Sequence, residues 1–119
     1  MDILYIEDEP SDAALVGRYI NTTGHQYENV ASFEAASERI AANQPDLILV
    51  DMIINHTRKG FAFVHALRDQ GYTRPIIAVT GLALDAEIKQ CYAVGCNAVL
   101  VKPYTIMELV ALLDKYLKS

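Results

Sequence analysis

Five polar residues stand directly after short apolar runs of the sequence, and their types suit ion and phosphoryl chemistry. Glu7 and Asp8 follow the first run, Asp51 follows a later one, and Thr80 and Lys102 follow the last two. Each of them alone is typical of a loop or of the start of a helix. If the runs are parallel strands of one sheet, their carboxyl ends meet at one edge, where such sheets bind ligands. The pattern therefore predicts a single cluster of three carboxylates, a hydroxyl and an ammonium group.

The predicted cluster suits a hard divalent cation. Neighbouring carboxylates repel one another, and a cation offsets that repulsion. Mg²⁺ prefers oxygen ligands and typically binds carboxylates together with a phosphoryl group. A protonated lysine cannot bind the metal, so Lys102 is expected to pair with an acid or with the ligand, and Thr80 to donate to the same ligand oxygens. These groups predict phosphoryl transfer, with the central Asp51 as the nucleophile.

The apolar runs have the pattern of strands buried on both faces of a parallel sheet. They are short and continuous, whereas half-exposed strands alternate between apolar and polar residues. A weaker strand is expected at 26–31, where polar residues interrupt the pattern as they do at a sheet edge. The four continuous runs are 3–6, 47–50, 76–79 and 98–101.

The segments between the runs have the period of amphipathic helices. Ser32 is predicted to cap the second helix, and Gly95 to end the fourth. The third is expected at 60–70, and Thr105 with Glu108 has the spacing of a capping box at the start of the last. Strand and helix thus alternate five times, which predicts an α/β protein with a doubly wound parallel sheet.

The composition restricts the class of protein. A chain of 119 residues is the length of one domain, expected to span 1–119. Its 15 acidic residues against 10 Lys and Arg give a net charge of −5, so no direct nucleic-acid partner is expected. No apolar run is long enough to span a bilayer, which predicts a cytoplasmic protein without a membrane partner. Cys91 and Cys96 lack the spacing of a zinc site and are expected to be buried, reduced thiols.

On these residues the chain resembles the receiver domain of two-component response regulators, over essentially its whole length. The resemblance implies a flavodoxin-like sheet of five strands in the order 2-1-3-4-5, with helices on both faces. It also implies a phospho-accepting switch of the stand-alone, single-domain type, which catalyses its own phosphorylation and dephosphorylation and is not otherwise an enzyme. The motifs that carry the resemblance are Glu7-Asp8, Asp51, Thr80-Gly81 and Lys102-Pro103.

The resemblance assigns roles to these residues. Asp51 would accept the phosphoryl group from a phosphohistidine on a sensor histidine kinase or a histidine phosphotransfer protein, docked on the first helix beside Ser11, Asp12 and Leu15. Lys102 and Thr80 would bind the phosphoryl oxygens. A downstream protein target would contact the face of the fourth helix, the fifth strand and the fifth helix, which includes Ile88, Tyr92, Tyr104 and Met107. The implied ligands of Mg²⁺ are Glu7, Asp8, Asp51 and the backbone carbonyl of Ile53.

Two features depart from the family pattern. Val99 stands three residues before the lysine, where the family has an aromatic ring that turns inward on phosphorylation. A valine cannot provide that motion, so we expect Thr80, the loop after it and the fourth helix to carry most of the response. The loop at 55–59 is one residue longer than the family pattern, because Gly60 comes nine residues after Asp51. It is expected to be a solvated surface segment.

Three other interpretations compete with the receiver. A haloacid-dehalogenase-type hydrolase needs a second Asp two residues after the nucleophile, where this chain has Ile53. A flavodoxin-like cofactor binder needs a phosphate-binding loop after the first strand, and the acids at 7–9 would repel that phosphate. A pseudo-receiver, which binds partners without phosphorylation, is the main alternative, although such proteins usually lack the acids or the lysine.

Overall fold

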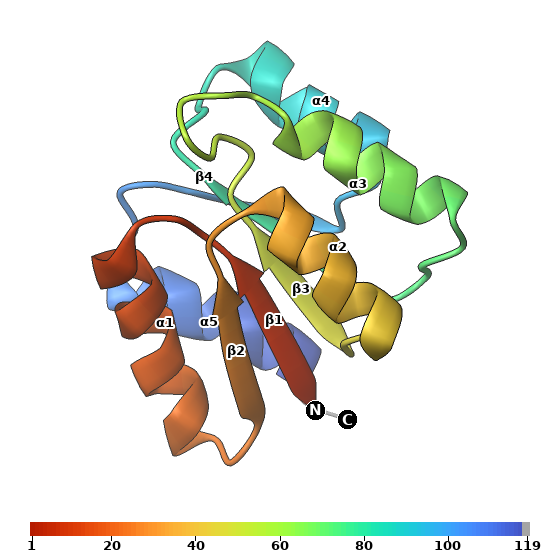
Figure 1. Ribbon diagram of the computed structural model, residues 1–119. Coiled ribbons are helices and arrows are strands. Elements are labelled where there is room, and N and C mark those ends of the chain that lie inside the picture. The colour runs from red at the N-terminus through yellow and green to blue at the C-terminus, as the bar shows by residue number, and fades with distance from the viewer. Residues whose placement is uncertain (118–119) are drawn as a thin grey trace.

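The computed structural model describes residues 1–117, which form a parallel sheet covered by helices (Figure 1). Strands and helices alternate along the chain as predicted. Residues 118 and 119, the end of the predicted domain, lie outside the described residues. The elements are β1 (Asp2–Ile6), α1 (Pro10–Thr22), β2 (Gln26–Val30), α2 (Phe33–Ala42), β3 (Leu47–Val50), α3 (Gly60–Asp69), β4 (Ile76–Thr80), α4 (Asp85–Val94), β5 (Ala98–Val101) and α5 (Ile106–Leu117).

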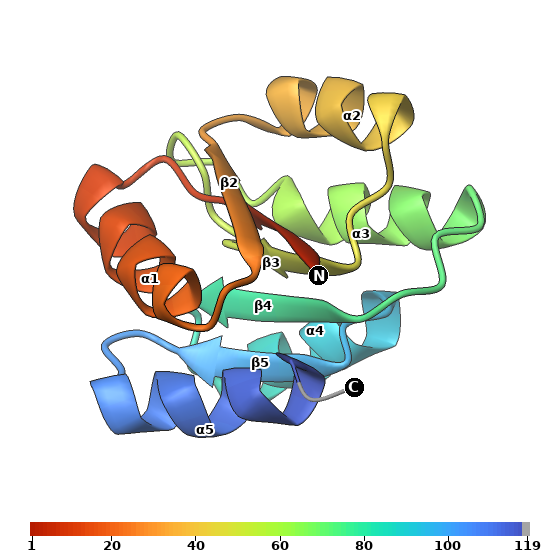
Figure 2. The same cartoon turned by 90° about the horizontal axis from the view of Figure 1, so that it is seen from below.

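The sheet has five strands in the order β2-β1-β3-β4-β5, and every neighbouring pair is parallel. The predicted α/β class and the strand order are thus confirmed. Helices α1 and α5 cover one face, and α2, α3 and α4 cover the other, so the helices lie along both sides of the sheet (Figure 2). Within the described residues, no helix is both long enough and apolar enough to cross a membrane.

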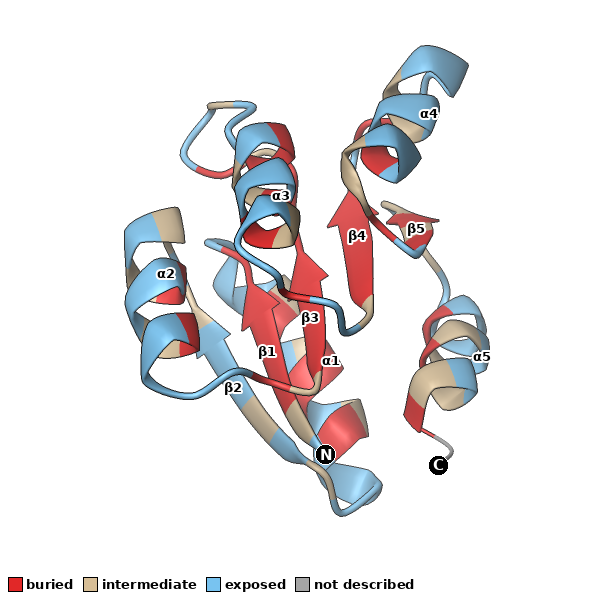
Figure 3. Cartoon of the chain, turned by 90° about the vertical axis from the view of Figure 1, so that its right-hand side faces the viewer, coloured by how far each residue is buried: buried red, intermediate tan, exposed pale blue. Residues whose placement is uncertain are grey.

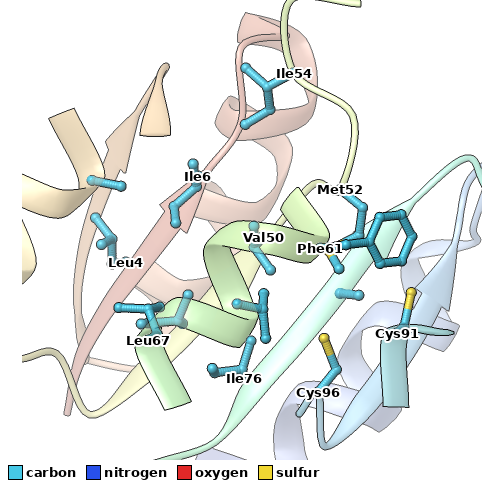
Figure 4. Close-up of a cluster of buried hydrophobic side chains, with 14 of the residues drawn as sticks. Leu4, Ile6, Val50, Met52, Ile54, Phe61, Leu67, Ile76, Cys91 and Cys96 are labelled. Carbon is cyan, nitrogen blue, oxygen red and sulfur yellow. The ribbon is translucent and has the colours of Figure 1, made fainter. Parts of the chain in front are cut away.

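Each face of the sheet has its own hydrophobic core because successive strand side chains point to opposite faces. Leu4 and Ile6 pack beneath α2, α3 and α4, whereas Ile3 and Tyr5 pack beneath α1 and α5. Figure 4 shows the first of these cores, in which the thiols of Cys91 and Cys96 are buried among apolar side chains. Both cysteines are free, as predicted.

The strands differ in burial according to their place in the sheet. Every residue of β3 and β4 is buried, whereas β2 is exposed or half-buried along its length (Figure 3). The polar residues of 26–30 therefore mark an edge strand, as expected, because water reaches that side of the sheet.

The helix ends follow local hydrogen-bonding signals. The Ser32 hydroxyl accepts from the amide of Ala35 at 3.1 Å. At the start of α5, Thr105 and Glu108 exchange side-chain and backbone hydrogen bonds of 3.1 Å, which confirms the capping box. Gly95 follows α4 with a φ of 121°, a conformation that favours glycine. Helix α3 ends at Asp69, one residue earlier than expected.

The loop between β3 and α3 makes a tight turn beside the carboxyl edge of the sheet. Asn55 and His56 have φ values of 54° and 61°, and the amides of Ile54 and Thr57 donate to each other's carbonyls at 3.1 Å. The side chains of Asn55 and His56 are exposed, as predicted for a solvated loop. Arg58 extends from the loop to α4, where it pairs with Glu87 at 2.9 Å.

Candidate functional site

The residues singled out in the sequence gather at the carboxyl edge of the sheet. Glu7, Asp51 and Lys102 are the first residues after β1, β3 and β5, and Thr80 is the last residue of β4. The register aligns the last residues of β1 and β3, and it aligns Thr80 with the last residue of β5. Because the strands are parallel, their ends bring these side chains to one edge.

Lys102 occupies the centre of this group. Its ammonium donates to Asp51 Oδ2 at 3.0 Å and contacts Asp12 Oδ2 at 2.9 Å, and it also donates to Glu7 Oε1. Burial acts to lower the pKa of Lys102, but hydrogen bonds to the three carboxylates outweigh that effect and raise the pKa above its ordinary value. Lys102 is therefore a fixed positive charge that offsets much of the repulsion among the acids.

Asp51 is held in place from two sides. Its Oδ1 accepts from the backbone amide of Ile53 at 2.9 Å, while its Oδ2 accepts from Lys102. The residue is only 7% exposed, so a reacting group can reach the carboxylate only from the open edge of the sheet. A carboxylate oriented in this way, beside a cation and open to solvent on one side, is suited to act as a nucleophile.

Glu7 is the most deeply buried acid of the group. It is 1% exposed, its Oε2 accepts from the amide of Asp8 at 3.1 Å, and its Oε1 accepts from the hydroxyl of Tyr5 at 3.3 Å. Burial raises the pKa of Glu7 to about 7, and the charge of Asp51 adds to the increase while Lys102 opposes it. Glu7 therefore gains from a nearby cation more than a surface acid would.

Asp8 and Thr80 contact the two loops that border the site. Asp8 is exposed, and its Oδ2 accepts from the amide of Asn55 at 3.0 Å. The side chain of Thr80 is fully buried, and its hydroxyl oxygen accepts from the amide of Leu82 at 3.3 Å. The loops after β3 and β4 are thus each linked to one residue of the predicted cluster.

The structure brings Glu7, Asp51 and Lys102 into direct contact and leaves Asp8 at the rim. Within residues 1–117 it contains no group of three or more acidic, histidine or cysteine side chains arranged to hold a metal ion. The physical reason is that the Lys102 ammonium lies between Glu7 and Asp51. The predicted metal ligands therefore remain a prediction.

The sequence places Asp12 near the site only as part of the face that meets the phosphodonor, and the structure adds that Asp12 contacts Lys102. It lies in the first turn of α1 and reaches Lys102, which is 90 residues away in the chain.

Comparison with known proteins identifies the family. The family model described as the response regulator receiver domain matches residues 3–114. This chain belongs to that family. Receiver domains of this family occur both in response regulators and in histidine kinases, as the relatives show. Membership sets aside the hydrolase and the flavodoxin-like cofactor binder as families for this chain, while a pseudo-receiver would still lie within the family.

Among curated proteins, the receiver domain is 30% identical over 119 residues to the transcriptional regulatory protein YvrH of Bacillus subtilis, covering 98% of this chain and 48% of YvrH. It is 28% identical over 106 residues to the sensor histidine kinase RcsC of Escherichia coli K12, covering 89% of this chain and 11% of RcsC. The chain thus spans less than half the length of these relatives, so their shared part is the receiver domain alone.

Solved receiver domains have the same fold. The BeF3-activated N-terminal receiver domain of Klebsiella pneumoniae RstA is 26% identical, with a TM-score of 0.86 and 98% of each chain covered. The chemotaxis response regulator CheY4 of Vibrio cholerae is also 26% identical, with a TM-score of 0.85 and 97% of each chain covered. The flavodoxin-like receiver fold implied by the resemblance is therefore confirmed.

Val99, which stands where the family has an aromatic ring, and Tyr104, two residues after Lys102, have different surroundings. Val99 is half-buried and packs against the core beneath α2, α3 and α4. Tyr104 packs against the opposite core, beneath α1 and α5, and its hydroxyl is buried. The hydroxyl of Tyr104 is therefore not exposed to a partner, and the place of the residue in an output surface stays a prediction. Tyr92 and Met107, by contrast, are exposed on α4 and α5.

Proposed function

We propose that this receiver domain is a cytoplasmic, phosphorylation-dependent switch of a two-component phosphorelay, in which Asp51 accepts the phosphoryl group. The observation that carries the proposal is the contact of 3.0 Å between the Lys102 ammonium and the Asp51 carboxylate at the open edge of the sheet. A pseudo-receiver has no need of this pair, because partner binding alone requires neither a nucleophile nor a cation beside it.

The reaction would proceed by in-line displacement at phosphorus. A carboxylate oxygen of Asp51 attacks the phosphorus of a phosphohistidine, the phosphorus–nitrogen bond breaks, and the imidazole leaves with that electron pair. The amide of Ile53 holds the other carboxylate oxygen, which orients the attacking one. Lys102 places its positive charge where the phosphoryl oxygens arrive, and the buried Thr80 hydroxyl at the end of β4 would turn toward them to donate. In dephosphorylation, water attacks the same phosphorus, the phosphorus–oxygen bond to Asp51 breaks, the carboxylate leaves with that electron pair, and inorganic phosphate is released.

The chemical types of the donors suit Mg²⁺, although the side chains of the described residues are not arranged around a metal position in this structure. Glu7, Asp8 and Asp51 supply carboxylate oxygens and Ile53 a backbone carbonyl, which are the hard oxygen ligands that this ion prefers. When bound, the ion would neutralise charge on the phosphoryl group during transfer. Glu7 supports this assignment most strongly, because burial penalises its ionised form and a second cation would offset that penalty.

The proposed partners are a phosphohistidine protein and a downstream protein target. The donor must approach the edge where Asp51 opens, beside Ser11 and Leu15 on α1, which are exposed and half-buried. Tyr92 and Met107 are 49% and 78% exposed, and they support an output surface over α4 and α5. The relatives are consistent with this arrangement because one is named a sensor histidine kinase and another a transcriptional regulator.

The proposal is tested by intact-mass measurement after incubation with acetyl phosphate. We expect the wild type to gain one phosphoryl group in the presence of Mg²⁺ and none in the presence of a chelator. The Asp51→Asn variant should gain none, whereas the control Asp69→Asn should behave as the wild type, because Asp69 ends α3 and its side chain is 71% exposed. A wild type without an adduct would favour the pseudo-receiver, and an adduct on Asp51→Asn would place the phosphoryl group elsewhere.

A further inference from the structure

The hydroxyl of Tyr104 is a buried polar group that lacks a partner. It is the buried side-chain polar atom within residues 1–117 for which the structure shows no hydrogen bond. Buried hydroxyl groups are nearly always hydrogen-bonded, because burying one without a partner is unfavourable. The position of this hydroxyl therefore calls for an explanation beyond packing, since a phenylalanine would fill the same apolar space without that penalty.

A cavity beside the site is bordered by Tyr104 and by Asp12, whose carboxylate can accept a hydrogen bond. The cavity has a volume of about 340 Å³ and lies between α1 and the loop from β5 to α5. Asp12 and Tyr104 border this same space, and burial together with the negative charge of Asp12 raises the pKa of Tyr104. The residues that line the cavity are Asp12, Leu15, Lys102, Pro103 and Tyr104.

Asp12 is engaged elsewhere, because its Oδ2 lies 2.9 Å from the ammonium of Lys102. An ammonium has three N–H donors; Glu7 and Asp51 accept two hydrogen bonds from Lys102, and Asp12 forms an ion pair with the same group. If Lys102 is to bind a phosphoryl oxygen, one of the three carboxylates must stop contacting the ammonium. Asp12 is the one released most easily, because its side chain is 32% exposed against 0% for Glu7 and 10% for Asp51.

We propose that Asp12 and Tyr104 form a switch pair, in which Asp12 positions Lys102 before phosphorylation and accepts a hydrogen bond from Tyr104 after it. The inference rests on the proposed function, because the phosphoryl group at Asp51 is what draws the ammonium away from Asp12. The new hydrogen bond forms only in the phosphorylated state, so its free energy favours that state. It couples the site to the loop that leads into α5.

In this chain Val99 stands where the family has an aromatic ring on β5, and the Asp12–Tyr104 pair responds to phosphorylation in place of that ring. The valine is fixed in the core on one face of the sheet, whereas Tyr104 lies on the other face, next to α1 and α5. Phosphorylation would therefore change the contacts between α1 and the start of α5.

The test is a double-mutant cycle on the binding of beryllofluoride, a phosphoryl mimic, in the presence of Mg²⁺. Tyr104→Phe removes only the hydroxyl, and Asp12→Ala removes its acceptor. We expect Tyr104→Phe to weaken beryllofluoride binding about three- to ten-fold, as the loss of one hydrogen bond predicts. In the Asp12→Ala background the same substitution should have no effect on binding. The control Tyr116→Phe, a half-buried tyrosine of α5 that packs against the same core, should bind as the wild type.

Two further measurements separate switching from a merely structural role. The Tm of metal-free Tyr104→Phe should equal or exceed that of the wild type, because an unpaired buried hydroxyl is removed. In the wild type, the ring carbon that bears the Tyr104 hydroxyl should change its NMR chemical shift when beryllofluoride binds, and in Asp12→Ala it should not.

Two outcomes would overturn the pair: wild-type affinity in Tyr104→Phe, or an equal loss of affinity in the Asp12→Ala background. A wild type that neither binds beryllofluoride nor forms an Asp51 adduct would instead overturn the proposed function. The two failures are therefore distinguishable.

Discussion

Replacement of Gly60 by alanine should destabilise the domain at the point where α3 begins. A Cβ at this position would lie 2.4 Å from the Cα of Met52 and 2.8 Å from its carbonyl oxygen. Carbon atoms in contact normally lie about 3.5–4.0 Å apart, so the two backbones would have to separate by about 1 Å or more. Because both Met52 atoms belong to the backbone, no side-chain rotation can relieve the clash.

The magnitude follows from three contributions. Overpacking of this kind costs about 1–3 kcal/mol, and the upper end applies because backbone must move. Separation also weakens the hydrogen bond of 3.2 Å from the Gly60 amide to the Met52 carbonyl, worth about 1 kcal/mol. The higher helix propensity of alanine returns at most about 1 kcal/mol. The net loss is therefore about 2–3 kcal/mol, or about 10 °C in Tm for a domain of this size.

The assay is urea and thermal denaturation followed by circular dichroism, with Gly81→Ala as the matched control. Nothing lies within 4 Å of a Cβ built on Gly81, so that variant should remain within about 0.5 kcal/mol of the wild type. If Gly60→Ala were as stable as Gly81→Ala, the close approach of α3 to Met52 would not constrain the fold and the reasoning would be refuted.

Two further predictions concern the acids of the site. Mg²⁺ should raise the Tm of the wild type because it binds only the folded state, and it should raise the Tm of Asp8→Asn by less. Thermal melts of the wild type that are identical with and without Mg²⁺ would contradict a metal site. The second concerns pH: burial raises the pKa of Glu7 from 4.5 to about 7, so the folded state disfavours its ionised form. In chelator, the wild type should lose stability relative to Glu7→Gln as the pH rises from about 5 to about 8, and parallel pH profiles from urea denaturation would show that Glu7 ionises freely.

The sequence was sufficient to predict the strands, most helix ends and the edge at which the site forms. These features depend on neighbouring residues: β4 is a continuous apolar run because both its faces are covered, and Ser32 caps α2 through a bond to a residue three positions away. The positions of Glu7, Asp51 and Lys102 followed from the same logic, since each comes directly after a strand and parallel strands end at one edge.

Only the tertiary structure showed that Asp12 contacts Lys102, that the Tyr104 hydroxyl is buried, and that α3 begins against the backbone of Met52. Each depends on how a helix packs against a strand or loop far away in the chain. A shift of about 1 Å in that packing makes or breaks a hydrogen bond or a close contact, whereas the pattern of apolar residues that predicts the helix stays the same. Local periodicity therefore determines which elements form, and the packing between them decides which side chains meet.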